Sequence, residues 1–237
     1  MTSALKIRTA PGGLMALALT ASADTLDAYF YTFTKAQMVA RATDPDPTSS
    51  AYFDAMVKSL GTLGWTVTAA PEIRGYQDNA AVSPLQACVS AVGGVMRQAI
   101  PLPEAGEAQL RSSVSAFEEA LDDAPAEVTD QLDEWWSQSA IAANNHMFTV
   151  GPIIQLGKAP IIPTAHLQLS VRAASWRSML SPGTQFSCAI TPVLLKLKWP
   201  AYNAIRDALH EELANTLADN VRCATLDLET VRLESAL

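Results

Sequence analysis

Cys188 is the residue whose type and position best suit covalent chemistry in this 237-residue chain. It lies within Phe186-Ser-Cys-Ala-Ile190, at the start of a strongly apolar segment. A nucleophilic cysteine needs a lowered thiol pKa, which a nearby cation or imidazole provides. No such group stands close to Cys188 in the sequence. We therefore expect a buried thiol that packs as a small apolar side chain, with acylation as the alternative.

The three histidines, His146, His166 and His210, form no recognisable catalytic arrangement. Since none has an evident partner, we expect them at surface or edge positions. The sequence has no GxSxG motif, glycine-rich phosphate loop, HExxH motif or dinucleotide-binding motif. Cys88 and Cys223 are distant from each other and from the third cysteine, so neither a zinc site nor a disulfide framework is expected. We predict no catalytic residue and no metal; a cysteine- or histidine-based enzyme site assembled only in the fold is the alternative.

Lys196, Lys198 and Trp199 form a candidate membrane-interface group. The two lysines alternate with Leu195 and Leu197, so one face of this segment is cationic and the other apolar. Tryptophan rings and lysine side chains both find partners at the boundary between lipid and water. Lysines that protect an edge strand from aggregation would give the same pattern.

Composition and charge exclude nucleic acid as a partner. The chain has 16 Lys and Arg residues against 24 Asp and Glu residues, for a net charge of −8, and no basic cluster. Binding to phosphates requires such a cluster. Ten acidic residues and only Arg111 as a basic one fall between residues 101 and 140, so the rest of the chain is almost neutral. A near-neutral body does not repel an anionic membrane or an apolar partner.

Helical periodicity and end signals predict helix pairs in the first part of the chain. The turn Asp44-Pro45-Asp46-Pro47 separates the first two helices, because a residue that precedes proline is disfavoured in a helix. Residues 71–82 are expected to form a loop. The expected helices are residues 24–43, 50–60, 84–99, 104–122, 125–139 and 200–220.

Strand patterns dominate the later part. Residues 167–173 alternate apolar and polar side chains, as in a strand that is buried on one side. Pro192 lacks a backbone donor and is expected to cause a bulge. The helices and strands are segregated along the chain, so we predict a single α+β domain over residues 1–237, with an antiparallel or mixed sheet covered by amphipathic helix pairs. The expected strands are residues 65–69, 146–156, 161–176, 186–199 and 221–229.

The N-terminal segment has the outline of a secretory signal. Lys6 and Arg8 precede the apolar residues 14–19, and residues 21–23 resemble a cleavage site. The apolar run is short, however, and follows Pro11-Gly12-Gly13. We therefore expect residues 1–23 to be retained, with an N-terminal strand, and cytoplasmic synthesis followed by release or membrane association. No run approaches the ~20 apolar residues of a membrane-spanning helix.

Paired amphipathic helices followed by long strands, a helix and a last strand resemble the cytolytic toxins of the Cyt type. The Erwinia virulence factor Evf shares their fold. Helix pairs 24–60 and 104–139 and strands 146–199 carry the resemblance, which covers most of the chain. It implies a three-layer α/β/α sandwich and a protein that perforates membranes by moving helices away from a sheet. By analogy with Evf, it also implies a bound or covalently attached fatty acid, with Cys188 as the candidate residue.

We therefore expect a lipid-binding, membrane-active protein, toxin-like or virulence-factor-like, with an apolar cavity or an insertable sheet. Its partner would be a lipid or membrane surface, with a homo-oligomer as a further possibility. The alternatives are an enzyme or a non-catalytic assembly subunit.

Overall fold

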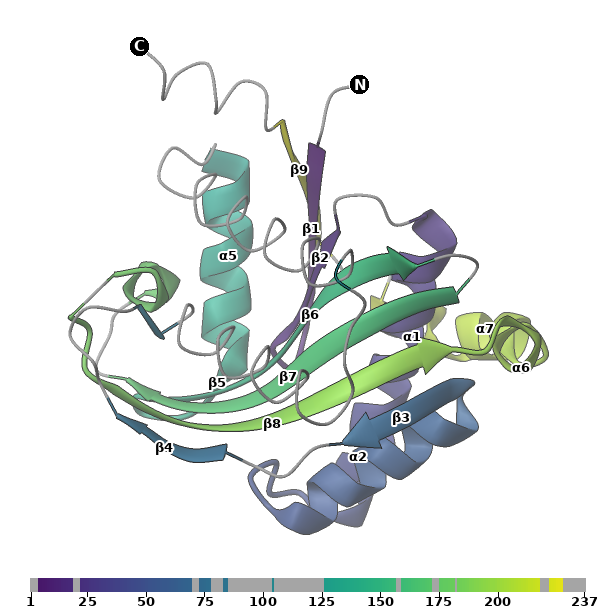
Figure 1. Cartoon of the computed structure of the whole chain (residues 1–237), viewed down its shortest axis with the longest axis horizontal. Coiled ribbons are helices and arrows are strands. Elements are labelled where there is room, and N and C mark those ends of the chain that lie inside the picture. The colour runs from purple at the N-terminus through teal and green to yellow at the C-terminus, as the bar shows by residue number, and fades with distance from the viewer. Residues whose placement is uncertain are drawn as a thin grey trace.

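The computed structural model describes residues 4–18, 22–69, 73–77, 83–84, 104, 126–156, 159–171, 175–181, 183–217 and 222–227 (Figure 1). The strands in this part of the chain are β1 (Ala4–Ala10), β2 (Leu14–Ala18), β3 (Trp65–Ala69), β4 (Ile73–Gln77), β5 (Ala140–Ala142), β6 (Asn145–Leu156), β7 (Ala159–Val171), β8 (Phe186–Leu197) and β9 (Arg222–Asp227). The helices are α1 (Ala23–Thr43), α2 (Ser50–Thr62), α5 (Ala126–Ser139), α6 (Trp199–Asn203) and α7 (Arg206–Leu217), with a 3₁₀ turn η1 (Trp176–Met179).

The described strands form one mixed sheet in the order β3-β8-β7-β6-β2-β1-β9, with β4 beside β8 and β5 beside β6. Strands β2 and β6 run parallel, whereas the other pairs are antiparallel. The N-terminal hairpin β1–β2 therefore lies inside the sheet, between β6 and β9. Residues 4–18 are thus part of the folded sheet, as the expected N-terminal strand required.

Helices cover both faces of this sheet. The contacts of two successive residues of β1 show this. Arg8 forms an ion pair with Asp27 of α1 at 2.7 Å. The next residue, Thr9, accepts a hydrogen bond from Gln131 Nε2 of α5 at 3.2 Å. Because successive side chains of a strand point to opposite faces, α1 and α5 lie on opposite sides (Figure 1). The structure is an α+β fold with helix, sheet and helix layers, as predicted.

The α1–α2 hairpin follows from local capping. The Ser22 hydroxyl caps α1 by accepting from the Thr25 N–H, and Ser49 caps α2 by accepting from the Tyr52 N–H at 3.0 Å. Between them, the Asp44 carboxylate accepts hydrogen bonds from the Ser49 hydroxyl and the Asp46 N–H. These two bonds lower the pKa of Asp44, the Ser49 hydroxyl more strongly. The proline-containing turn thus ends one helix and begins the next.

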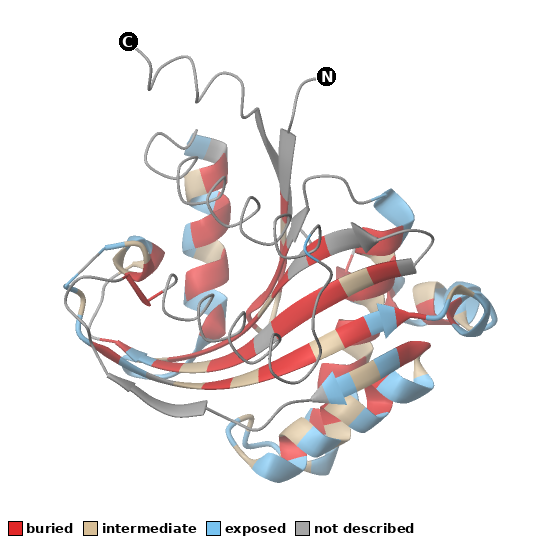
Figure 2. Ribbon diagram, viewed as in Figure 1, coloured by how far each residue is buried: buried red, intermediate tan, exposed pale blue. Residues whose placement is uncertain are grey.

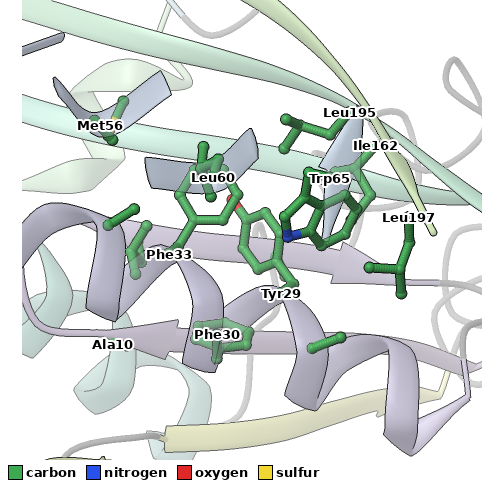
Figure 3. Close-up of a cluster of buried hydrophobic side chains, with 14 of the residues drawn as sticks. Ala10, Tyr29, Phe30, Phe33, Met56, Leu60, Trp65, Ile162, Leu195 and Leu197 are labelled. Atoms are coloured by element: carbon green, nitrogen blue, oxygen red, sulfur yellow. The ribbon is translucent and has the colours of Figure 1, made fainter. Parts of the chain in front are cut away.

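Large side chains fill the layer between α1, α2 and the sheet (Figure 3). Tyr29 and Phe33 of α1 lie with ring centroids 4.4 Å apart. Trp65 of β3 packs in the same cluster and donates its indole N–H to Thr32 Oγ1 at 2.8 Å. Buried polar groups need such partners. Within the described residues, this layer is a packed core.

The bond between Trp65 and Thr32 gives a first prediction. Thr32→Val keeps the side-chain shape but removes the acceptor, so the buried indole N–H loses its partner. We expect the free energy of unfolding in urea to fall by about 1–3 kcal/mol. The Thr32 hydroxyl also donates to the carbonyl four residues earlier, and the Thr43 hydroxyl makes the same bond at an exposed position. Thr43→Val is therefore the matched control. A change of at most ~0.5 kcal/mol is expected there; equal losses in the two variants would contradict the role of Trp65.

Three local expectations were wrong, and two expected helices cannot be compared. Residues 73–77 form β4 where a loop was expected, because pairing with β8 outweighs weak local strand signals. The expected helix 200–220 is divided into α6 and α7. Pro192 causes no bulge against β7, because the register of β8 with β7 runs through Pro192 without a shift. On the other edge of β8, β4 pairs with residues up to Ile190 and β3 pairs from Val193 onward. Helices 84–99 and 104–122 lie almost wholly outside the described residues.

Candidate functional site

The long strands β6, β7 and β8 form an antiparallel sheet whose two faces differ in chemistry. They contain 12, 13 and 12 residues. Phe148 of β6 faces α5, since its ring centroid lies 4.6 Å from that of Trp135. Its cross-strand partner is Leu167, and the partner of Leu167 is Ile190. Directly opposed residues share a face, so this row defines what we call the α5 face.

The described side chains of the α5 face are apolar along the three strands, apart from one polar residue at each end. Most of them are buried (Figure 2). His146 stands at one end and the exposed Lys196 at the other. The apolar members on this face are Phe148, Val150, Ile161, Pro163, Leu167, Leu169, Val171, Phe186, Ile190, Pro192 and Leu194.

The opposite side, which we call the α1–α2 face, has a polar centre. Thr149, Thr164 and His166 lie there, and all three are buried. Gly151 makes room for Tyr29 of α1, because a Cβ at this position would stand 3.1 Å from the Tyr29 hydroxyl oxygen. Burial raises the pKa of Tyr29, so it stays protonated. The three strands therefore carry an apolar row on the α5 face, whereas the α1–α2 face combines this buried polar group with apolar core residues such as Ile162, Val193 and Leu195.

His166 is the most unusual member of this polar centre. Its Nδ1 lies 3.1 Å from Thr149 Oγ1, whereas its Nε2 is buried and has no hydrogen-bond partner among the described residues. The rings of Phe53 and Tyr52 of α2 lie 5.5 and 6.5 Å from the imidazole. Burial lowers the pKa of His166 to about 4, since a charged imidazole would lose its hydration. His166 is therefore a neutral imidazole beneath α2 at ordinary pH.

His146 lies on the α5 face, against α5. Its Nδ1 is 2.9 Å from Ser139 Oγ, and its ring centroid is 4.0 Å from that of Trp136. Burial lowers its pKa, and a bond to the Trp136 carbonyl opposes the shift. Both His146 and His166 are buried, contrary to the expected surface positions, while His210 on α7 is partly exposed. The three histidines belong to three separate places in the fold and form no common catalytic group.

Lys196, Lys198 and Trp199 lie where β8 passes into α6. Both lysines are exposed, and Leu195 and Leu197, which alternate with them, are buried, so the expected alternation is present. Trp199 is partly buried against the core cluster, and its ring centroid lies 6.1 Å from that of Tyr202. A membrane-interface role for these residues stays a prediction.

Cys188 occupies an internal position of the sheet. Its backbone pairs with Leu169 of β7 on one side and with Tyr76 of β4 on the other. The side chains of Cys188 and Cys223, like all of Cys88, lie outside what the structure describes. Acylation of Cys188 therefore stays a prediction. The strand β4, which sequence patterns missed, is what encloses this position.

The described residues contain no group of three His, Cys, Asp or Glu side chains that could hold a metal ion. No helix among them combines the length and the apolar character needed to cross a membrane.

Comparisons with known proteins find similarity only at the level of structure. No protein-family model and no curated protein matches the chain. The activated Cyt2Ba monomer from Bacillus thuringiensis subsp. israelensis is 13% identical, with 78% of this chain and 96% of that chain covered and a TM-score of 0.42. A delta-endotoxin is 10% identical over 77% and 79% of the two chains, also with a TM-score of 0.42. The Evf virulence factor is 10% identical over 89% and 84%, with a TM-score of 0.32. The predicted resemblance in fold is confirmed; at these values it carries no conclusion about function.

Proposed function

We propose that this protein is a lipid-binding, membrane-active protein whose strands β6, β7 and β8 turn their α5 face toward hydrocarbon. One observation carries the proposal: the described side chains of that face are apolar along three strands of 12 or 13 residues, while the other face has a polar centre. A bilayer-crossing strand needs ~9–11 residues and one apolar side. The packed α1–α2 layer favours an insertable sheet over a preformed cavity on that side.

Helix α5 packs on β6 at one side of this face, as well as on β1 and β9, so we propose that its movement away from the sheet uncovers Phe148 and the apolar row that begins there. Near its N-terminal end, α5 is held to the turn η1 by a hydrogen bond of 3.3 Å from Arg177 Nη2 to Thr129 Oγ1. Arg177 is exposed and Thr129 is partly exposed, so both positions accept a thiol reagent after substitution. At its other end α5 continues directly into β5. A covalent link between α5 and η1 would therefore prevent α5 from swinging out.

The second prediction tests this movement. In a chain whose native cysteines are serine, Thr129→Cys and Arg177→Cys are joined by a short, reducible thiol cross-linker. We expect the linked protein to lose most of its dye release from lipid vesicles, and reduction to restore it. Each single variant treated with the same reagent is the control for labelling alone.

A second link identifies which helix layer moves. Arg8→Cys and Asp27→Cys replace the ion pair that joins β1 to α1. The proposal expects this link to leave substantially more dye release than the link to α5. Loss of release with the α1 link but not with the α5 link would overturn the proposed movement. Absence of release by the unlinked protein at neutral and acid pH would overturn membrane activity itself.

The proposal includes a fatty acyl thioester at Cys188 as one form of lipid binding. Its register partner Leu169 is buried on the α5 face, which supports an apolar setting. The thiolate would displace the carrier of an activated acyl donor, so that the carrier leaves as its thiol. Intact mass should then exceed the sequence mass by one acyl group, which hydroxylamine removes and Cys188→Ser abolishes. An unmodified mass would refute acylation and leave the test of the sheet intact.

We also propose cytoplasmic synthesis with residues 4–18 retained, followed by release or membrane association. The position of β1 and β2 inside the sheet supports retention. N-terminal sequencing of the vesicle-bound protein should find this segment present.

A further inference from the structure

A cleft of about 480 Å³ lies where α6 and α7 meet the start of α1. Its volume falls within the range of small-molecule sites. Trp199 is among its lining residues, which come from α6, α7 and α1. Helix α1 lies on the opposite side of the sheet from α5. The lining residues are Asp24, Asp27, Trp199, Tyr202, Asn203, Arg206, Asp207 and His210.

Aromatic rings form one wall of this cleft and are fixed by mutual contacts. The Tyr202 hydroxyl lies 2.9 Å from His210 Nε2, and the His210 ring stacks on Tyr31 with centroids 3.7 Å apart. Trp199 meets Tyr202 edge to face. Tyr202 is almost fully buried, whereas Trp199 and His210 are partly exposed. The cleft thus offers the partly exposed rings of Trp199 and His210, which the buried Tyr202 holds in place.

Acidic side chains line the cleft beside these aromatic rings. Three carboxylates, from Asp24, Asp27 and Asp207, line the cleft, with Arg206 as the single guanidinium. Asp207 pairs with Arg206 at 3.1 Å and Asp27 pairs with Arg8 at 2.7 Å, whereas Asp24 has no ion pair within the described residues. Burial, together with the charges of Asp27 and Asp24, raises the pKa of Tyr202 to about 12, against the opposing effect of Arg206. The charge balance favours a cation over an anion.

We propose that this cleft binds an organic cation, namely a quaternary ammonium group of the choline type. Aromatic faces attract such cations and exclude their water, while a nearby carboxylate supplies a counter-charge. A compact metal cation would leave the aromatic rings unused, and an anion would meet the unpaired carboxylate of Asp24 beside two carboxylates that are already paired. The inference is independent of the membrane activity proposed above, because free choline suffices to test it.

Binding is tested by calorimetric titration of the full chain with choline chloride against sodium chloride at equal ionic strength. We expect saturable binding of choline and of tetramethylammonium, and none of sodium or inorganic phosphate. Asp24→Asn should weaken binding by about tenfold, because it removes the unpaired carboxylate. Trp199→Leu should weaken it as well, through loss of the ring. Glu211→Gln is the matched control: it neutralises one exposed carboxylate on α7 outside the cleft, so affinity should change less than twofold.

Vesicle binding then separates the two sources of the ammonium group. Free choline should compete with vesicles of phosphatidylcholine if the lipid headgroup occupies the cleft, and should leave their binding unchanged if the ligand is a free amine. Both results keep the site. The inference is overturned if wild-type protein shows no saturable choline binding, if calcium or phosphate binds in its place, or if Asp24→Asn and Glu211→Gln reduce affinity equally.

Discussion

Replacing Gly13 by alanine is expected to cost at least about 4 kcal/mol of unfolding free energy, the range of the most disruptive single substitutions. Gly13 ends the turn between β1 and β2 with φ of +73°. A Cβ at this position would stand 2.1 Å from the carbonyl oxygen of Met147 in β6. That neighbour is backbone, and Gly13 itself accepts a hydrogen bond from the Thr149 N–H at 2.9 Å. The parallel pairing of β2 with β6 would therefore have to separate.

Gly183→Ala is the matched control for this prediction. Gly183 has a similar φ of +81°, but a Cβ there would meet no atom of the described residues within 4 Å. Only the left-handed backbone conformation is then penalised, at about 1–2 kcal/mol. Urea denaturation of both variants measures the difference. Similar losses would mean that the close approach of Gly13 to β6 has no role in stability.

Acidification is expected to weaken the fold through His166. The folded-state pKa is about 4 and the ordinary value is 6.5, so the unfolded chain binds the proton more readily. The contribution of neutral His166 is complete above pH 6.5 and is lost as pH falls toward 4. Between about pH 7.5 and pH 5 the loss for this one group is about 2 kcal/mol. Protonation places a charge beneath Tyr52 and Phe53, at the contact between α2 and the sheet.

His166→Gln removes this titration and keeps a polar group beside Thr149. The free energy of unfolding is measured for wild type and variant at pH 7.5 and at pH 5. Its decrease between these two pH values should be about 2 kcal/mol larger in wild type than in the variant. Some dependence will remain in the variant, because the pKa of His146 is lowered as well. Tyr52 stays neutral throughout, since burial raises its pKa. Equal pH dependence in both proteins would refute the assignment to His166.

Sequence patterns located most elements because their signals are local. The turn at Asp44–Pro47, the capping serines and the alternation along residues 167–171 each act within a few positions, and the structure has the expected helices and strands there. The β4 strand was missed because its stability comes from β8, more than a hundred residues later. The division between α6 and α7 likewise follows packing that periodicity does not record.

The candidate site was predicted less completely, for a related reason. Lys196, Lys198 and Trp199 were found from alternation within one strand, and the structure keeps that alternation. The environment of His166 depends on β6 and α2, and the choline-type cleft joins the start of α1 to α6 and α7. Nothing local in the sequence marks either group. The continuous apolar α5 face could not be predicted either, because it depends on the register in which β6, β7 and β8 pair.

The pairing of β1 with β9 has a consequence for biogenesis. Leu5 opposes Leu226, more than two hundred residues later in the chain, so β1 cannot pair on this side until β9 has been translated. Such a high contact order makes folding slow. During translation, before β9 is available, the β1–β2 hairpin has an unpaired edge along β1. The edge of β1 is therefore open to pairing with other chains until β9 has been translated.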